Sequence, residues 1–434
     1  MESILDKVKG SAEEAEVFSV AHHNTEVMFE ANRLKLVQTK ESRGTALRVI
    51  KNGHMGLAAT NKSGDEQELP DKALEMAPYG VEAKFSFPKP QVYPSVSTFD
   101  PEVESVSEEK LVEIGQALID RVRASNPDLL CEASVHRGTA SVQIMNSNGG
   151  MAEYRESVFS IAVEGVLIKG TDMLFVGDQE SSCHPVLTSD NVVKSTLQQL
   201  ERARNTTSIS TGSMPVIFTA LGVAAVLLEP LLVAFNGKTV LRGASPLGKR
   251  KGEQVFTPDL SIWDDGTIDF CPAASICDDE GVPSRRTPLI DKGVVSNFLY
   301  DLQTAAEAGA ESTGSATRSL ASLPSPSSSA VIVNEGQMSF ADMLAEIKEG
   351  LIVEEVMGAG QGNVLGGDFS GNVLLGYKVE NGEIVGRVKN TMISGNVYDV
   401  FKEGVAFGSD SRWIGGSLNT PSVYCPRVSV AATG

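Results

Sequence analysis

Histidine, the side chain that most often ligates zinc, is scarce in this 434-residue sequence. The five histidines are His22, His23, His54, His136 and His184, so none lies beyond residue 184. No His-x-x-x-His or His-Glu-x-x-His pair is present. A zinc site needs three or four converging nitrogen, sulfur or oxygen ligands. The second half of the chain therefore cannot supply a histidine to any metal.

Cysteine is scarce as well. The five cysteines are scattered and odd in number, which is not the pattern of a disulfide framework and indicates a reducing compartment. The first residues contain no basic stretch followed by an apolar one, so we expect no secretion signal. Together these features predict a cytoplasmic protein.

Positive charge is in short supply. Lysine and arginine number 37 against 56 aspartate and glutamate residues, which gives a net charge of −19. Because nucleic acids and anionic membranes bind basic surfaces, we expect neither as a direct partner. One apolar run, residues 215–235, is long enough to suggest a membrane span, but it contains Glu229 next to Pro230. We expect a buried strand that leads into a buried helix instead.

The first half of the chain alternates between strand and helix patterns. Short runs of β-branched and apolar residues predict strands at 16–20, 26–29, 33–39, 46–50, 55–60, 131–136, 140–145 and 158–169. Asn52-Gly53 predicts a hairpin turn. Helices are predicted over 71–78, over 111–122 after a capping box of Ser105 and Glu108, and over 192–200.

The second half is rich in glycine, serine and short β patterns. A helix is predicted at 340–347 with Ser339 as its cap, and Asn381-Gly382 predicts another hairpin. The sequence therefore indicates an α+β fold: an N-terminal α/β-sheet region followed by a β-rich C-terminal domain. We expect the parts to span residues 1–90, 91–210 and 211–434.

No catalytic motif stands out from the residues alone. Gly237-Lys238-Thr239 resembles the end of a phosphate-binding loop, but Leu232 occupies the position of its first glycine. There is no Gly-x-Ser-x-Gly sequence. The serine-rich segment 312–329 is predicted to be a surface or crossing loop, and the acidic segments 264–265 and 278–280 are predicted to be turns.

Several long segments carry a family resemblance. The strongest reads Asp-Asp-Glu-Gly-Val-Pro-Ser-Arg-Arg at 278–286 and leads through 289–301 to Ser-Thr-Gly-Ser-Ala-Thr-Arg at 312–318. A second reads Gly-Gly-Asp-Phe-Ser-Gly at 366–371 and is followed by Thr-Met-Ile-Ser-Gly-Asn at 391–396. These segments resemble the TldD/PmbA family, also called modulators of DNA gyrase. The resemblance covers nearly the whole chain.

The resemblance implies a metallopeptidase that cuts flexible peptides. The active member carries His-Glu-x-x-x-His on a helix, where two histidines ligate zinc and the glutamate is the general base. Alignment places Glu229, Pro230 and Val233 where His, Glu and His would stand. The chain is therefore similar to the PmbA (TldE) branch, which lacks the zinc motif. For this branch we expect no cofactor, no metal ligands and no catalytic residues.

The resemblance also implies partners. It predicts a homodimer in isolation, a heterodimer with a TldD-like zinc-bearing subunit, and a peptide substrate held between the two subunits. A β-rich domain can bind an extended peptide through main-chain hydrogen bonds. The predicted peptide-binding residues are Gly366, Gly367, Asp368, Phe369 and Ser370, although the same stretch also fits a set of tight β turns.

Two alternatives remain open at this point. The chain could be a stand-alone hydrolase with another metal or a carboxylate site, for which Glu229, Asp368 and Glu380 are the residues to test. It could also be a scaffold that binds peptides without cleaving them.

Overall fold

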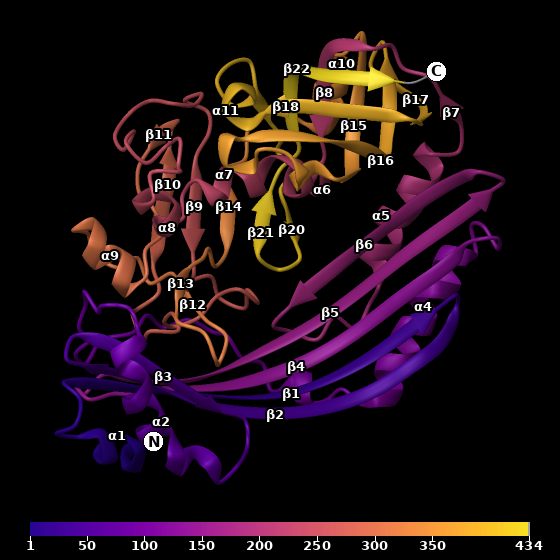
Figure 1. The fold of residues 1–434 in the computed structure, drawn as a ribbon. Coiled ribbons are helices and arrows are strands. Elements are labelled where there is room, and N and C mark those ends of the chain that lie inside the picture. The colour runs from indigo at the N-terminus through magenta and orange to yellow at the C-terminus, as the bar shows by residue number, and fades with distance from the viewer. Residues whose placement is uncertain (433–434) are drawn as a thin grey trace.

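The computed structural model describes residues 1–432 and has the predicted α+β fold. Its N-terminal half is built on an antiparallel six-stranded sheet with the order β3-β2-β1-β4-β5-β6. The strands are β1 (Glu14–Glu30), β2 (Arg33–Lys51), β3 (His54–Thr60), β4 (Leu130–Asn146), β5 (Met151–Lys169) and β6 (Asp172–Ser182). Figure 1 shows this sheet as a long curved layer, with the C-terminal half over one of its faces.

The strands are longer than the sequence predicted. The strands expected at 16–20 and 26–29 are one strand, β1, and those expected at 131–136 and 140–145 are one strand, β4. The polar residues between them stay in register: His23 pairs with Glu41 on one side and with Thr139 on the other. Exposed polar side chains do not end a strand when its backbone groups are paired with both neighbours.

Turn chemistry fixes the hairpins as predicted. Asn52 and Gly53 both have positive φ, at 52° and 72°, as a two-residue turn between β2 and β3 requires. Ala31 and Asn32 form a similar turn between β1 and β2, with φ of 47° and 68°. The Asn32 side chain bonds the backbone at Leu129 and Cys131, which offsets the strain of this conformation.

Helices cover the other face of the N-terminal sheet. They are α1 (Glu2–Val8), α2 (Leu69–Met76), α4 (Glu108–Arg123) and α5 (Asp190–Arg202), with the short helices η1 (Asp65–Glu68), η2 (Ala77–Tyr79) and α3 (Glu102–Ser105). Alternation along β1 separates the two faces. Val17 and Val27 pack with the helices, whereas Phe18 and Val20 face the C-terminal half.

The C-terminal half contains two further sheets. The larger has the path β15-β8-β22-β18-β16-β17-β7, and β16 also pairs with β15, which closes the path into a ring of five strands. Its strands are β7 (Thr206–Thr207), β8 (Gly212–Phe218), β15 (Glu349–Met357), β16 (Asp368–Glu380), β17 (Glu383–Val388), β18 (Thr391–Asn396), β19 (Ala406–Phe407) and β22 (Val423–Ala432). The Asn381-Gly382 turn joins β16 to β17, as predicted.

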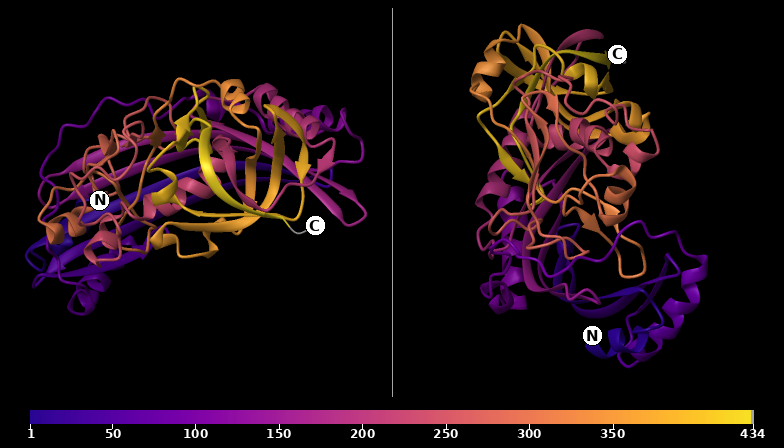
Figure 2. Two further views of the ribbon diagram at one scale, coloured as in Figure 1. Left: turned by 90° about the horizontal axis from the view of Figure 1, so that it is seen from above. Right: turned by 90° about the vertical axis from the view of Figure 1, so that its left-hand side faces the viewer.

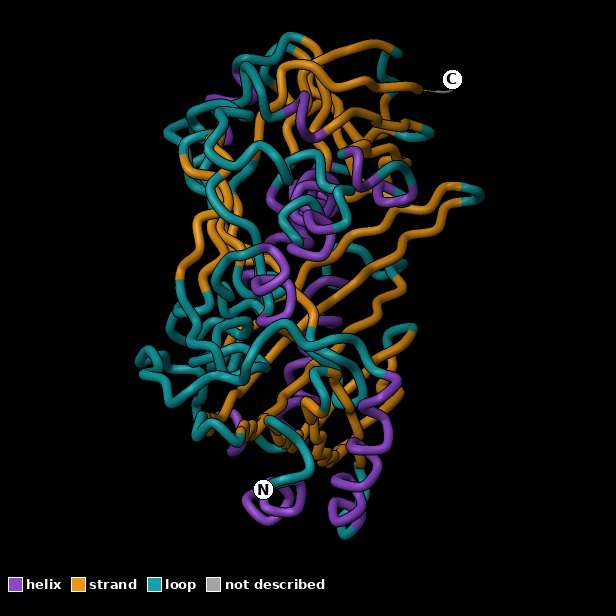
Figure 3. Tube along the Cα trace, turned by 60° about the vertical axis from the view of Figure 1, so that its left-hand side comes forward, coloured by secondary structure: helices purple, strands orange, loops and turns teal. Residues whose placement is uncertain are grey.

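The second C-terminal sheet has the order β11-β10-β9-β14-β21-β20. Its strands are β9 (Ile262–Asp265), β10 (Arg286–Asp291), β11 (Val294–Val295), β14 (Val331–Val333), β20 (Arg412–Ile414) and β21 (Leu418–Thr420), with a separate pair formed by β12 (Ala316–Thr317) and β13 (Ser325–Pro326). Figure 3 shows that much of the chain between these strands and the N-terminal sheet is loop.

Short helices complete the C-terminal half. They are α6 (Ala220–Gly222), η3 (Val223–Leu228), α7 (Glu229–Val233), α8 (Gly237–Leu241), α9 (Leu302–Ala308), α10 (Phe340–Ala345), η4 (Ala359–Gln361), η5 (Val364–Gly366) and α11 (Val397–Val400). None of the helices within residues 1–432 is long and apolar enough to cross a membrane. The two ends of the described chain lie far apart, at opposite ends of the molecule (Figures 1 and 2).

Candidate functional site

The apolar run at 215–235 forms a strand followed by a helical segment, as predicted. The β8 strand leads through Thr219, whose hydroxyl accepts the N–H of Gly222 at 3.4 Å, into α6, η3 and α7. The hydrogen bonding of η3 is of the wider π type, and α7 begins immediately afterwards, with Pro230 in its first turn. Because proline has no N–H to donate, the regular α-helical pattern cannot run through this position.

The residues that the sequence analysis placed at the zinc-motif positions have unequal exposure. Glu229 is exposed, Val233 is half-buried, and Pro230 is buried. The family motif spaces its histidines five residues apart, whereas Glu229 and Val233 are four apart, so the register Leu228-Glu229-Val233 fits that spacing better. In either register no histidine or cysteine is present. These residue types do not fit a zinc ion, and no chemical step is assigned to one on this chain.

The two predicted site segments lie next to each other. A Cβ placed on Gly360 would lie 3.4 Å from a carboxylate oxygen of Glu229. The loop that begins there continues through η5 into β16, where Asp368 accepts a hydrogen bond from Asn396 Nδ2 at 2.8 Å. Residues far apart in sequence, from α7 and from the glycine-rich segment, thus form one surface region.

Within that region the predicted peptide-binding residues differ in how far their side chains are exposed to solvent. The Phe369 ring is 1% exposed and packs edge-on against Phe218, with 6.2 Å between ring centroids. Asp368 and Ser370 point outward. Gly367 has φ of 85°, and a Cβ there would lie 2.4 Å from the Tyr398 ring, so this glycine is required by local packing.

The carboxylates that a stand-alone hydrolase would use, Glu229, Asp368 and Glu380, do not form one cluster among the described residues. Glu380 lies at the far end of β16, where its carboxylate is 2.6 Å from Lys378 Nζ. Asp368 opens the same strand, and Glu229 is on α7. Across residues 1–432 no group of three or more histidine, cysteine, aspartate or glutamate side chains is arranged to hold a metal ion.

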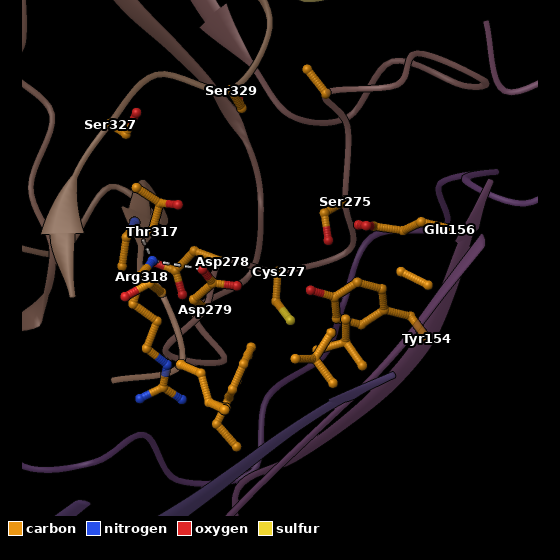
Figure 4. Close-up of a pocket in the computed structure, with 18 of the residues that line it drawn as sticks. Tyr154, Glu156, Ser275, Cys277, Asp278, Asp279, Thr317, Arg318, Ser327 and Ser329 are labelled. Carbon is orange, nitrogen blue, oxygen red and sulfur yellow. Dashed lines mark hydrogen bonds between the residues drawn. The ribbon is translucent and has the colours of Figure 1, made fainter. Parts of the chain in front are cut away.

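Sequence reasoning missed a cavity of about 700 Å³ that lies between the N-terminal sheet and the C-terminal loops. We call it the interdomain cleft. Its walls come from β1, β2, β4 and β5 on one side and from residues 273–284, 314–320 and 327–329 on the other. Ser42 and Arg43 are exposed at its edge, so the cleft opens to solvent. Figure 4 shows its interior.

A buried ionic network joins the two halves beside the cleft. Arg48, on β2, donates two hydrogen bonds of 3.0 Å to the Glu16 carboxylate and one of 2.8 Å to Glu280. Arg318 Nη2 lies 2.8 Å from the same Glu16 carboxylate. The four side chains are at most 1% exposed. Burial opposes ionisation of Glu16, but Arg318 and Arg48 outweigh it, and the pKa of Glu16 is lowered.

The acidic segment 278–280 is a turn, as predicted, but it is buried in the interdomain contact. Asp278 accepts the backbone N–H groups of Glu280 and Val282 at 2.9 Å each and of Ala316 at 3.0 Å. Burial, followed by the charge of Glu280, raises the pKa of Asp278 well above its ordinary value. Asp279 accepts the backbone N–H of Arg318 at 2.8 Å. The turn thus ties the serine-rich segment to the cleft.

A smaller cavity of about 310 Å³ lies beside α6 and η3, and Leu221 is part of its wall. Its buried Glu354 accepts hydrogen bonds from Gln199 Nε2 at 2.9 Å and Arg202 Nη1 at 3.1 Å. These bonds link α5 of the N-terminal half to β15. Because the Glu354 carboxylate is already hydrogen-bonded to Gln199 and Arg202, we assign it a structural role.

Comparison with known proteins agrees with this architecture. A family model described as the PmbA/TldA metallopeptidase C-terminal domain matches residues 211–432, which is more than half of the chain. The chain belongs to the PmbA/TldD family. A second model, PmbA/TldA metallopeptidase domain 1, matches residues 15–77 of this family member.

Individual PmbA/TldD relatives match over different lengths. An uncharacterized protein of Methanocaldococcus jannaschii is 29% identical over 415 residues, which cover 94% of each chain. The metalloprotease PmbA of Escherichia coli is 32% identical over 223 residues, or 51% of this chain and 47% of that protein. The crystal structure of TldE from Thermococcus kodakarensis aligns with a TM-score of 0.92 at 24% identity over 100% of both chains. At that identity the likeness shows a shared fold.

Proposed function

We propose that this chain is the TldE-like subunit of a TldD/TldE-type metallopeptidase, without zinc or catalytic residues of its own. The observation that carries the proposal is the helical segment after β8, where we expect the zinc helix: it has no histidine or cysteine at the motif positions, whether these are Glu229, Pro230 and Val233 or Leu228, Glu229 and Val233. In a PmbA/TldD family member, that replacement fits a subunit whose role is to complete a peptide chamber while a partner supplies the zinc.

Peptide binding by main-chain pairing is supported by the geometry of β16. Its first residues, from Asp368 to Gly371, pair with β18 on one side. On the other side no strand within residues 1–432 pairs with them, but the loop 357–363 covers part of the edge, and the backbone N–H of Asp368 donates to the Asn363 carbonyl at 3.2 Å. Main-chain pairing at a strand edge gives an extended peptide affinity without strong sequence preference, and here it would require the 357–363 loop to yield part of the edge. The exposed side chains of Asp368 and Ser370 flank that edge.

The test is reconstitution with a TldD-type zinc-bearing subunit. We expect peptide hydrolysis to rise as this chain is added to a fixed amount of that subunit, and to level off at equal amounts. A Glu229→Ala variant should activate as well as the natural chain, because Glu229 has no catalytic role in this account. No gain in hydrolysis and no complex by size-exclusion chromatography would overturn the proposal.

The two alternatives give different outcomes in the same assay. Hydrolysis by the chain alone that is abolished in Glu229→Ala would favour a stand-alone hydrolase. Peptide affinity without any change in hydrolysis when the zinc-bearing subunit is added would favour a scaffold.

A further inference from the structure

Glu156 is a half-buried carboxylate without a cation partner. It lies on β5 and lines the interdomain cleft. Burial, followed by the negative charge of Asp279, raises its pKa to about 7, and no lysine, arginine or histidine contributes to that pKa. A buried charge without a partner is costly, so native proteins pair such groups or bind a ligand to them.

Other acceptors surround Glu156 in the same corner of the cleft. Figure 4 shows its carboxylate and the hydroxyl groups of Ser275 and Tyr154 gathered on one side, with Cys277 and Asp279 on the other. The Ser275 hydroxyl oxygen is buried, and its hydrogen bonding lowers the pKa of Glu156, although burial outweighs this effect. We call Tyr154, Glu156, Ser275 and Asp279 the acceptor corner.

The nearby arginines do not neutralise this corner. Arg48 and Arg318 face Glu16 and Glu280, which balance their two positive charges. Asp279 interacts with Arg318 mainly through its backbone N–H. Negative charge is therefore in excess. The remaining charged or titratable groups of the wall are Asp278, whose raised pKa favours its neutral form, Cys277, and Arg43 and His22 at the exposed edge.

We propose that the acceptor corner binds the primary ammonium group of a peptide, either its amino terminus or a lysine side chain. An ammonium has three N–H donors and one positive charge. Glu156 and Ser275 offer acceptors on one side of the corner, and Glu156 and Asp279 supply negative charge. The inference rests on the proposed peptide-handling function, and it names the group by which this chain recognises its substrate.

An anionic ligand fits the cleft less well. Arg318 is the buried cation of the cleft wall, and its guanidinium nitrogens make no hydrogen bond of good geometry within the described residues. However, it lies 2.8 Å from Glu16 and 4.2 Å above the Phe18 ring. Its charge is already compensated, and a further carboxylate there would face Glu16 and Asp279.

The test measures binding by the isolated chain, so it does not depend on a partner or on hydrolysis. Isothermal titration would use an alanine tetrapeptide amide with a free amino terminus, its N-acetylated form, and an N-acetylated tetrapeptide amide that contains one lysine. We expect the first peptide to bind, and Glu156→Gln to weaken it by about tenfold or more through loss of a charge-assisted hydrogen bond. Glu153→Gln is the matched control, because Glu153 is on the same strand but exposed.

The peptides separate the two sources of the ammonium group. Binding of the free-terminus peptide alone assigns the amino terminus, and binding of the lysine peptide assigns the side chain. Equal binding of all three peptides, no binding of either amine, or an unchanged affinity in Glu156→Gln would overturn the inference. If these peptides fail to bind as expected but the chain still activates a zinc-bearing subunit, the proposed function stands and only the ammonium site is overturned.

Discussion

Glu156 makes stability depend on pH at the scale of a single residue. Its pKa is about 7 in the folded protein against 4.5 for a free glutamate, so the folded state holds the proton more tightly. The unfolding free energy should therefore fall as pH rises from about 4.5 to 7. Glu156→Gln should remove this loss and raise stability by up to ~3 kcal/mol at about pH 8, with little effect at about pH 4.

Urea unfolding of the Glu156→Gln and Glu153→Gln variants at both pH values provides the measurement. The exposed Glu153 variant should show no such pH dependence. An equal effect of Glu156→Gln at both pH values would mean that Glu156 does not titrate in this range.

The sequence indicated part of the site at this scale. The segments 278–286 and 312–318 stood out through their resemblance to the family, and they supply Asp279 and Arg318 to the cleft. Their N-terminal partners could not be predicted. Arg48 and Glu280 are 232 positions apart, and only strand register and the docking of the two halves bring them together.

At the scale of elements, the structure differs from the sequence prediction at the N-terminal cap of α4. The predicted cap was Ser105, but that hydroxyl bonds Glu102 within α3. The prediction was wrong because α3 and α4 are separate helices, and the cap is Ser107, which accepts the N–H of Lys110 at 3.2 Å.

Ser107→Ala should therefore destabilise the protein by about 1 kcal/mol through the loss of a helix cap. Ser105→Ala, two residues away, should cost clearly less. Thermal or urea unfolding of the two variants compares them directly, and a larger effect at Ser105 would contradict the cap assignment.

Local patterns predicted which elements form better than how far they extend. The hairpin turns and the capping of α10 by Ser339 follow from nearby residues, and the structure confirms them. The lengths of β1 and β4 do not, because their central polar residues are held by pairing with neighbouring strands. The closure of the C-terminal sheet through β15 and β16 likewise depends on contacts that a local pattern does not contain.

At the scale of the whole molecule, Arg48 couples the two halves. Arg48→Met keeps most of the volume but leaves Glu280 buried without its cation, which should cost about 3 kcal/mol or more. Arg43→Met, on the same strand but exposed, should change stability by less than about 0.5 kcal/mol.

Adding Glu280→Gln to Arg48→Met should recover part of the loss, because the unpaired charge is removed. Chemical unfolding of the single and double variants measures this, and independent, additive effects would show that Arg48 and Glu280 do not interact.

The central claim is that this chain is a subunit without zinc, and that its partner subunit carries the zinc ion. Native mass spectrometry of this chain mixed with a TldD-type zinc-bearing subunit measures the subunit composition and the bound zinc in one experiment. The account predicts a heterodimer that carries one zinc ion, and homodimers of this chain alone that carry none. About one tightly held zinc per chain in those homodimers, or no mixed species, would contradict it.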